Sequence, residues 1–157
     1  MANPTSYVPV KVRGLAIDPK SRLPILLLQD HGGRVLLPIW IGAFEAGAIA
    51  TRLEGRDFPR PMTHDLLKLT IEALGAQVRR VDIRALQKGT FFANLHLETG
   101  AGEVVCIDCR PPDAVSLAVR AGAPIRVAAK VLEAAQPMPH ADAAEDDRDG
   151  DDLDNDD

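Results

Sequence analysis

The sequence predicts an α+β domain of two β-β-β-α repeats, with an extra helix between the repeats. Strand-like segments come in two groups of three, and an amphipathic helix follows each group. The two helices can also be aligned residue by residue, which favours an internal duplication. Elements grouped in this order predict a twisted or barrel-like sheet packed with helices.

The first group contains three expected strands. Three valines alternate with Pro9, Lys11 and Arg13 over residues 8–13, which predicts a strand with one buried face that can continue to residue 17. The continuous apolar run Ile25–Leu28 is typical of a strand covered on both faces. A hairpin turn at Asp30–Gly33 then leads into a third strand, Arg34–Ile41.

Two helices are expected next, joined by a proline-containing connector. The first helix lies between Gly42 and Gly55, and the second runs from Thr63 to Leu74. The apolar positions of the first helix follow helical spacing and are Ala46, Ile49, Ala50 and Leu53. The apolar positions of the second helix are Leu67, Ile71 and Leu74.

The second group of strands is expected at Val78–Leu86, Phe91–Glu98 and Val104–Cys109. The helix that follows begins at Arg110-Pro-Pro-Asp and ends at Gly122. A short strand (Ile125–Val127) and a short helix (Lys130–Gln136) are expected to form a small cap.

The duplication rests on the alignment of Glu45 with Asp113. This alignment matches the four apolar positions of the two repeat-ending helices and places Arg52 on Arg120. The repeated order of elements supports the match, because all amphipathic helices share the same period.

Acidic residues are concentrated at the C-terminus. Residues 141–157 hold ten of the 23 acidic residues but one of the 18 basic residues, which leaves about +4 in residues 1–140. A segment so acidic and so poor in apolar residues cannot bury enough surface to fold. We therefore expect one domain over residues 1–140 and a disordered tail over residues 141–157. No signal peptide is recognisable, so a cytoplasmic location is expected.

Cys106 and Cys109 have C-x-x-C spacing within an expected strand. Odd spacing in a strand places two side chains on opposite faces, and the chain has no second cysteine pair. We interpret them as ordinary part-buried cysteines rather than zinc ligands.

Glu45 and Asp113 each lie in the first turn of a predicted helix. One interpretation is that each stabilises its helix through the macrodipole. The other is that two carboxylates near one cleft bind a divalent cation and act as a general base. Arg110 lies at a strand end beside a helix N-terminus, a natural anion position, although Asp108 can equally be its ion-pair partner.

Arg60, His64 and Asp65 lie in or just after the connector. Pro59 and Pro61 restrict the backbone around Arg60, so these side chains are expected to be held in place. Histidine is suited to proton transfer near neutral pH, and arginine to a bidentate grip on phosphate. The structural alternative is a solvated histidine at the helix start and an aspartate that stabilises its helix through the macrodipole.

Four residues share one face of the strand expected at 91–98. They are Phe92, Asn94, His96 and Glu98. We interpret this face as a solvated surface of the sheet, and the alternative is a polar surface that contacts a ligand or a second subunit.

Several segments resemble the bifunctional nuclease domain family, in the same order and over roughly residues 8–132. They are LPIWIG (37–42), EAGAIATRLEG (45–55), PRPMTHDLL (59–67), GTFFANLHL (89–97) and IDCRPPDAVSLAVRAGAPI (107–125). The resemblance implies a twisted α+β domain of two halves that often self-associates and cleaves both RNA and DNA. Pro112 stands where the family usually has serine, which removes a hydroxyl and a backbone N–H from the start of a helix.

Two functional hypotheses follow. In the first, the protein is a nuclease that acts on RNA and DNA with low sequence specificity. A Mg²⁺ or Mn²⁺ ion would be held by Glu45 with Asp113 or Asp65. His64 would act as general base or acid, and two arginines, Arg60 and Arg110, would neutralise the phosphate.

In the second hypothesis, the same Glu, Arg, His and Asp residues bind a small anionic ligand or a protein partner without catalysis. Under either hypothesis we expect a homo-oligomer, with a dimer favoured, and no membrane association. The chain lacks the common motifs of P-loop nucleotide hydrolases, dinucleotide-binding enzymes and serine or zinc hydrolases.

Overall fold

The computed structural model describes residues 5–135 and 138–139, and the acidic segment 141–157 lies outside them. The strands are β1 (Tyr7–Ile17), β2 (Pro24–Asp30), β3 (Val35–Trp40), β4 (Gln77–Gln87), β5 (Thr90–Glu98), β6 (Val104–Cys109), β7 (Ile125–Ala128) and β8 (Met138–Pro139). The helices are α1 (Ala43–Leu53), α2 (Thr63–Ala73), α3 (Pro111–Ala121) and α4 (Ala129–Ala134). No helix in these ranges is long and apolar enough to cross a membrane.

The strands form one sheet in the order β6-β5-β4-β7-β1-β2-β3-β8. The first three strands of each repeat are antiparallel to one another, which confirms the two predicted groups. Within the described residues the sheet is open, so the barrel-like alternative is wrong. The short strand expected in a terminal cap instead joins the repeats, because β7 pairs with β4 on one side and with β1 on the other.

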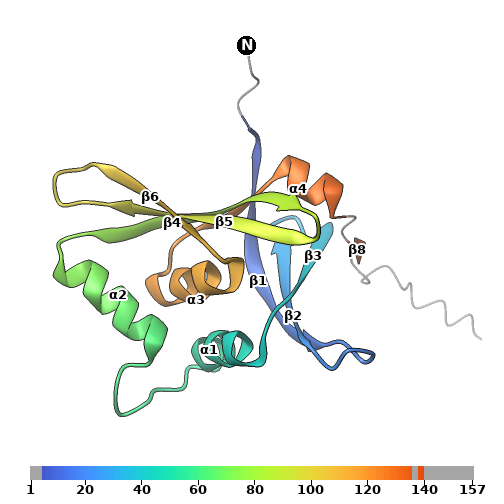
Figure 1. The fold of residues 1–157 in the computed structure, drawn as a ribbon, viewed down its shortest axis with the longest axis horizontal. Helices are drawn as coiled ribbons and strands as arrows, with labels where there is room; N and C mark the ends of the chain where they lie inside the picture. The colour runs from blue at the N-terminus through green and yellow to red at the C-terminus, as the bar shows by residue number, and fades with distance from the viewer. Residues whose placement is uncertain (1–4, 136–137, 140–157) are drawn as a thin grey trace, which may run out of the picture.

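Helix α3 lies at the centre of the helical layer. Figure 1 shows α1, α2 and α3 on one side of the sheet and α4 on the other. Eight of the eleven residues of α3 are buried, and the helix packs against α1, α2, β4 and β5. Val115, Leu117 and Ala118 join the hydrophobic core with side chains from both repeats. The start of α3 is therefore a fixed point for a functional site.

Two predicted apolar helix faces are only partly covered. On α1, Ile49 is buried but Leu53 is exposed. On α2, Ile71 is buried and Leu67 is 41% exposed, and Leu74, the residue that follows the helix, is 82% exposed. Helix α2 packs on α3 and β4 along one side, so the rest of its apolar surface faces outward.

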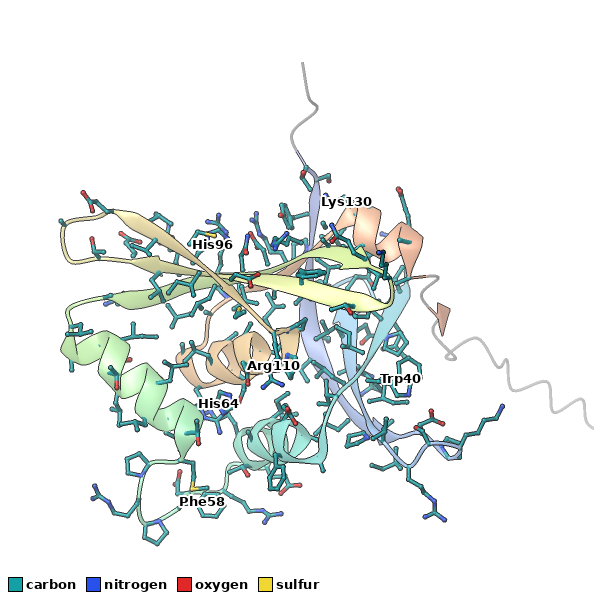
Figure 2. All side chains as sticks on the ribbon, in the orientation of Figure 1. Trp40, Phe58, His64, His96, Arg110 and Lys130 are labelled. Carbon is teal, nitrogen blue, oxygen red and sulfur yellow. The ribbon has the colours of Figure 1, made fainter. Side chains whose placement is uncertain are left out.

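The polar face of β5 is not simply solvated, which corrects the sequence interpretation. His96 lies on the side of the sheet away from His64 (Figure 2). Its Nε2 is 3.2 Å from Oδ2 of Asp82, a buried carboxylate that accepts two hydrogen bonds of 2.8 Å from Arg126. Burial tends to raise the pKa of Asp82, but hydrogen bonds from Arg126 and Arg80 outweigh it and lower the pKa. This face therefore holds a structural charge network.

Candidate active site

The first turns of α1 and α3 bring the two predicted carboxylates together. Glu45 is the third residue of α1, and Asp113 is the third residue of α3. Prolines occupy the first two positions of α3, where the missing N–H groups would have no partner within the helix. Because α1 and α3 pack against each other, one side chain can contact both carboxylates.

Arg110 makes that contact. Its Nη1 donates to Oε1 of Glu45 at 2.9 Å, and its Nε donates to Oδ2 of Asp113 at 2.9 Å. The backbone N–H of Glu45 and the Arg110 guanidinium both lower the pKa of the Glu45 carboxyl. A Cβ at Gly42 would collide with this carboxylate, so the glycine leaves room for Glu45 to fold back onto its helix. Arg110 remains exposed.

His64 joins the cluster from the start of α2. Its Nε2 lies 3.1 Å from Oδ1 of Asp113, and its side chain is 13% exposed. Figure 2 shows His64 and Arg110 in the region where α1, α2 and α3 converge. A carboxylate bonded to one ring nitrogen fixes the orientation of an imidazole and leaves the other nitrogen for proton transfer.

These four residues border a pocket of about 500 Å³ between α1 and residues 58–64. We call it the α1 pocket. Its other walls are mainly apolar or small side chains, among them Phe44, Gly47, Phe58 and Met62. The structure thus brings Glu45, His64, Arg110 and Asp113 together at one cavity.

Asp65 and Arg60 lie outside the cluster of His64, Arg110, Glu45 and Asp113. Asp65 accepts a hydrogen bond from the backbone N–H of Met62 at 3.0 Å and one from Nε of Arg120 at 2.6 Å. These two bonds, the backbone bond first, lower the pKa of Asp65. Arg60 is exposed and lines a neighbouring groove. The structure therefore does not bring either residue into the His64–Asp113 cluster.

Arg120 is the residue that the sequence interpretation missed. Its side chain is 5% exposed, and it donates to Asp65 of α2, to the Ser116 carbonyl of α3 and to the Ala48 carbonyl of α1. The sequence did contain a sign that Arg120 is buried. It aligns with Arg52, but it lies in a helix whose other residues are mostly apolar, including the preceding Val119.

The alternative partner considered for Arg110 is also wrong. Asp108 pairs with Arg84 at 3.3 Å, because the alternation of β6 directs Asp108 toward the polar side of the sheet. Arg110 lies beyond the end of β6, at the N-cap of α3, where it can turn toward the helices.

The donor set offers limited support for a metal ion. No group of three or more His, Cys, Asp or Glu side chains suited to a metal occurs among the described residues. Glu45 and Asp113 are the two carboxylates expected to bind one, and the Arg110 guanidinium lies between them. A divalent cation held by both carboxylates therefore requires Arg110 to move away, which its exposed position permits.

Comparison with known proteins shows the family of this chain. The bifunctional nuclease domain matches residues 26–139, a range that contains all four clustered residues. An uncharacterized protein of Mycobacterium tuberculosis is 42% identical over 123 residues, which cover 78% of this chain and 73% of that protein.

Two plant proteins are more distant. Bifunctional nuclease 1 of Arabidopsis thaliana is 30% identical over 105 residues, covering 66% of this chain and 32% of the plant protein. Bifunctional nuclease 1 of Oryza sativa subsp. japonica is 28% identical over 122 residues, covering 73% and 37%. This chain thus spans about a third of each plant relative. Since the domain match extends over most of the described fold, the chain belongs to the bifunctional nuclease domain family.

Proposed function

We propose that the protein hydrolyses phosphodiester bonds of RNA and DNA, with low sequence specificity, at the α1 pocket. The observation that carries the proposal is the contact of His64 and Arg110 with one carboxylate, Asp113, at the edge of a pocket. A base held by a carboxylate beside an exposed arginine is an arrangement that suits phosphate chemistry.

Each residue has a distinct role in this proposal. Arg110 is 64% exposed and can exchange its bonds to Glu45 and Asp113 for a bidentate grip on a phosphate. Asp113 keeps the imidazole of His64 oriented. His64 then accepts a proton from the attacking water or donates one to the leaving oxygen.

A divalent cation belongs to the same proposal. When Arg110 turns to the phosphate, Glu45 and Asp113 become available to hold Mg²⁺ or Mn²⁺, both of which favour carboxylate ligands. A cation bound there would polarise the phosphate and lower the pKa of a coordinated water. Proton transfer and the grip on the phosphate remain the roles of His64 and Arg110.

The test is cleavage of labelled single-stranded RNA and DNA by the purified full chain, in Mg²⁺, in Mn²⁺ and in EDTA. We expect His64→Ala to lose roughly 10²-fold or more in rate, the usual worth of general acid–base catalysis. Glu45→Gln should lose its response to metal. The matched control is His31→Ala, because His31 is an exposed histidine in the β2–β3 turn.

The second candidate function is a binding module that uses the same cluster without catalysis. It is favoured by the bonds of Arg110, which already pairs with both carboxylates. Equal cleavage by wild type, Glu45→Gln and His64→Ala would identify a contaminating nuclease and leave binding as the function.

Self-association is a further part of the proposal. Strand β6 is the terminal strand of the sheet, and its Val104, Val105 and Ile107 are exposed. An exposed apolar edge strand is a template for pairing with a second copy. Helix α2, which carries the exposed Leu66, Leu67 and Leu69, lies on the same half of the molecule as β6 (Figure 1). We expect a symmetric dimer.

Light scattering after size exclusion tests the dimer. Ile107→Lys should give a monomer, while Ile17→Lys, which changes an exposed isoleucine of β1, should not alter the mass. A wild-type monomer would refute the interface.

A cytoplasmic location is proposed as well. Cys106 and Cys109 are both free thiols, which suits a reducing compartment. Fractionation of cells that express the full chain tests it.

A further inference from the structure

We propose that the α1 pocket binds one unpaired nucleobase, and that the adjoining phosphate lies in a basic groove on the other side of Phe58. This inference rests on the proposed function and adds a substrate preference to it. An enzyme that places a base in a pocket needs that base to be unstacked, so single strands are the favoured substrate over duplex.

The first observation is the position of the aromatic side chains. The chain has four phenylalanines, and two of them, Phe44 and Phe58, line the α1 pocket. Phe44 is 95% exposed, so it contributes almost nothing to the core and remains available to a ligand. Exposed aromatic rings next to a phosphate-binding arginine are typical platforms for bases of single-stranded nucleic acid.

The second observation is a glycine inside α1. Gly47 lies in the middle of the helix, where glycine is less favourable than alanine by about 1 kcal/mol. A Cβ at this position would meet no atom within 4 Å, so close packing does not require the glycine. Gly47 lines the α1 pocket together with Ala43 and Ala48. Small side chains along this side of α1 keep the pocket open.

The third observation is charge. A second groove, of about 380 Å³, adjoins the α1 pocket and shares Thr51, Phe58 and Arg120 with it. We call it the arginine groove. Its basic side chains are Arg52, Arg56, Arg60 and Lys68, of which Arg56 pairs with Glu54 and Lys68 with Glu72. Its two acidic residues are Asp57 and Asp65, and the second is already paired with the buried Arg120.

The two cavities together match one nucleotide and its neighbour. The apolar α1 pocket suits a base, and its volume lies within the usual range of small-ligand sites. The arginine groove suits the phosphodiester backbone, whose negative charge dominates nucleic-acid affinity. Phe58 lines both cavities, and so we place the sugar across this side chain. In this arrangement Arg60 would contact a phosphate of the nucleic-acid backbone other than the one that reacts.

The experiment is equilibrium binding of the full chain to fluorescein-labelled oligonucleotides, followed by anisotropy in EDTA so that metal-dependent cleavage is suppressed. The probes are a single-stranded oligodeoxyadenylate, the same backbone with abasic sugars throughout, and the adenylate paired in a duplex. The variants are Phe44→Ala and Gly47→Leu, and the matched control is Ile17→Ala, which removes an exposed apolar side chain that lines neither cavity.

We expect Phe44→Ala and Gly47→Leu each to weaken binding of the adenylate roughly tenfold, the usual size of one base–aromatic contact. Abasic and duplex probes should bind the wild type more weakly by a similar factor and should not distinguish wild type from Phe44→Ala. Circular dichroism melting checks that Gly47→Leu is folded, and Phe44→Ala supports the test independently because its side chain is almost fully exposed.

Four results would overturn the inference. Equal affinity of all variants for the adenylate, or equal affinity of the wild type for adenylate and abasic probes, excludes a base in the α1 pocket. If the wild type still cleaves, the proposed function survives that failure. If the wild type neither binds nor cleaves, both proposals fail. A change of mass in Gly47→Leu would assign the α1 pocket to a second copy of the chain.

Discussion

The imidazole of His64 lies 3.1 Å from the carboxylate of Asp113, although 49 positions separate the two residues in the sequence. The contact joins the first turn of α2 to the first turn of α3. Each residue alone has an ordinary structural explanation at a helix start. Their contact has a different consequence, because a carboxylate that fixes an imidazole makes a general base or acid of defined orientation.

The first prediction is that His64 and Asp113 act as a unit. His64→Ala and Asp113→Asn should each lower kcat/KM on single-stranded RNA by roughly 10²-fold or more. The double variant should lose little beyond either single variant, since residues that serve one proton transfer are not additive. Kinetics of the four proteins form the test. Multiplicative losses would show that the residues act separately.

The second prediction concerns Arg120 and Asp65. Arg120→Met removes a buried guanidinium that bonds to all three packed helices, and we expect a loss of about 3 kcal/mol in the free energy of unfolding. Asp65→Asn should cost about 2 kcal/mol, because the buried Arg120 loses its charged partner but keeps its bonds to the Ser116 and Ala48 carbonyls. Urea unfolding measures both changes.

Activity then separates the two roles of Asp65. If Asp65 is structural, Asp65→Asn should keep its wild-type kcat at temperatures well below its Tm. A loss of kcat in a fully folded Asp65→Asn protein would instead restore the catalytic role considered from the sequence.

Local pattern was sufficient to predict most of the fold. Alternation and turn residues placed β4 and β5 correctly, and the prolines marked the start of α3. The role of β7 was not predictable, because four residues carry no sign of their partners, and pairing with both repeats is decided by the whole sheet.

For the site, residue type and helix position selected Glu45, His64, Arg110 and Asp113. The sequence did not show that two adjacent residues would have different surroundings. His64 and Asp65 are adjacent in sequence, but successive helical residues point in different directions. His64 therefore reaches Asp113, whereas Asp65 reaches Arg120. The α1 pocket was missed because Phe44 and Gly47 resemble ordinary helix positions until the surrounding elements are placed.

The third prediction concerns the cysteines. Cys106 is exposed, whereas Cys109 is half-buried, and burial, followed by the nearby Asp108 charge, raises the pKa of Cys109 to about 11. Only the thiolate is nucleophilic. In native protein at pH 8, one thiol, Cys106, should react rapidly with Ellman's reagent, and Cys109 only after unfolding. Rapid modification of Cys106→Ser would contradict this assignment.

The fourth prediction concerns the acidic segment 141–157, whose charge is known from the sequence alone. Ten acidic residues attached to a body of about +4 should compete with nucleic acid for basic surfaces such as the arginine groove. Deletion of residues 141–157 should tighten binding of the adenylate probe at low salt, with a smaller effect at high salt. Unchanged affinity at low salt would exclude this competition.

The fifth prediction concerns Asp82, whose lowered pKa makes the fold sensitive to acid. The ionised carboxylate stabilises the folded state above its unfolded pKa, near 3.8, and this stabilisation is lost as the pH falls through the lower folded pKa. Asp82→Asn leaves Arg126 without its charged partner and should cost about 3 kcal/mol at pH 7. The difference from wild type should shrink below pH 3.8. Urea unfolding at both pH values measures it, with Asp108→Asn as control, because Asp108 is 73% exposed in its pair with Arg84. A difference independent of pH would mean that the amide disrupts packing rather than charge.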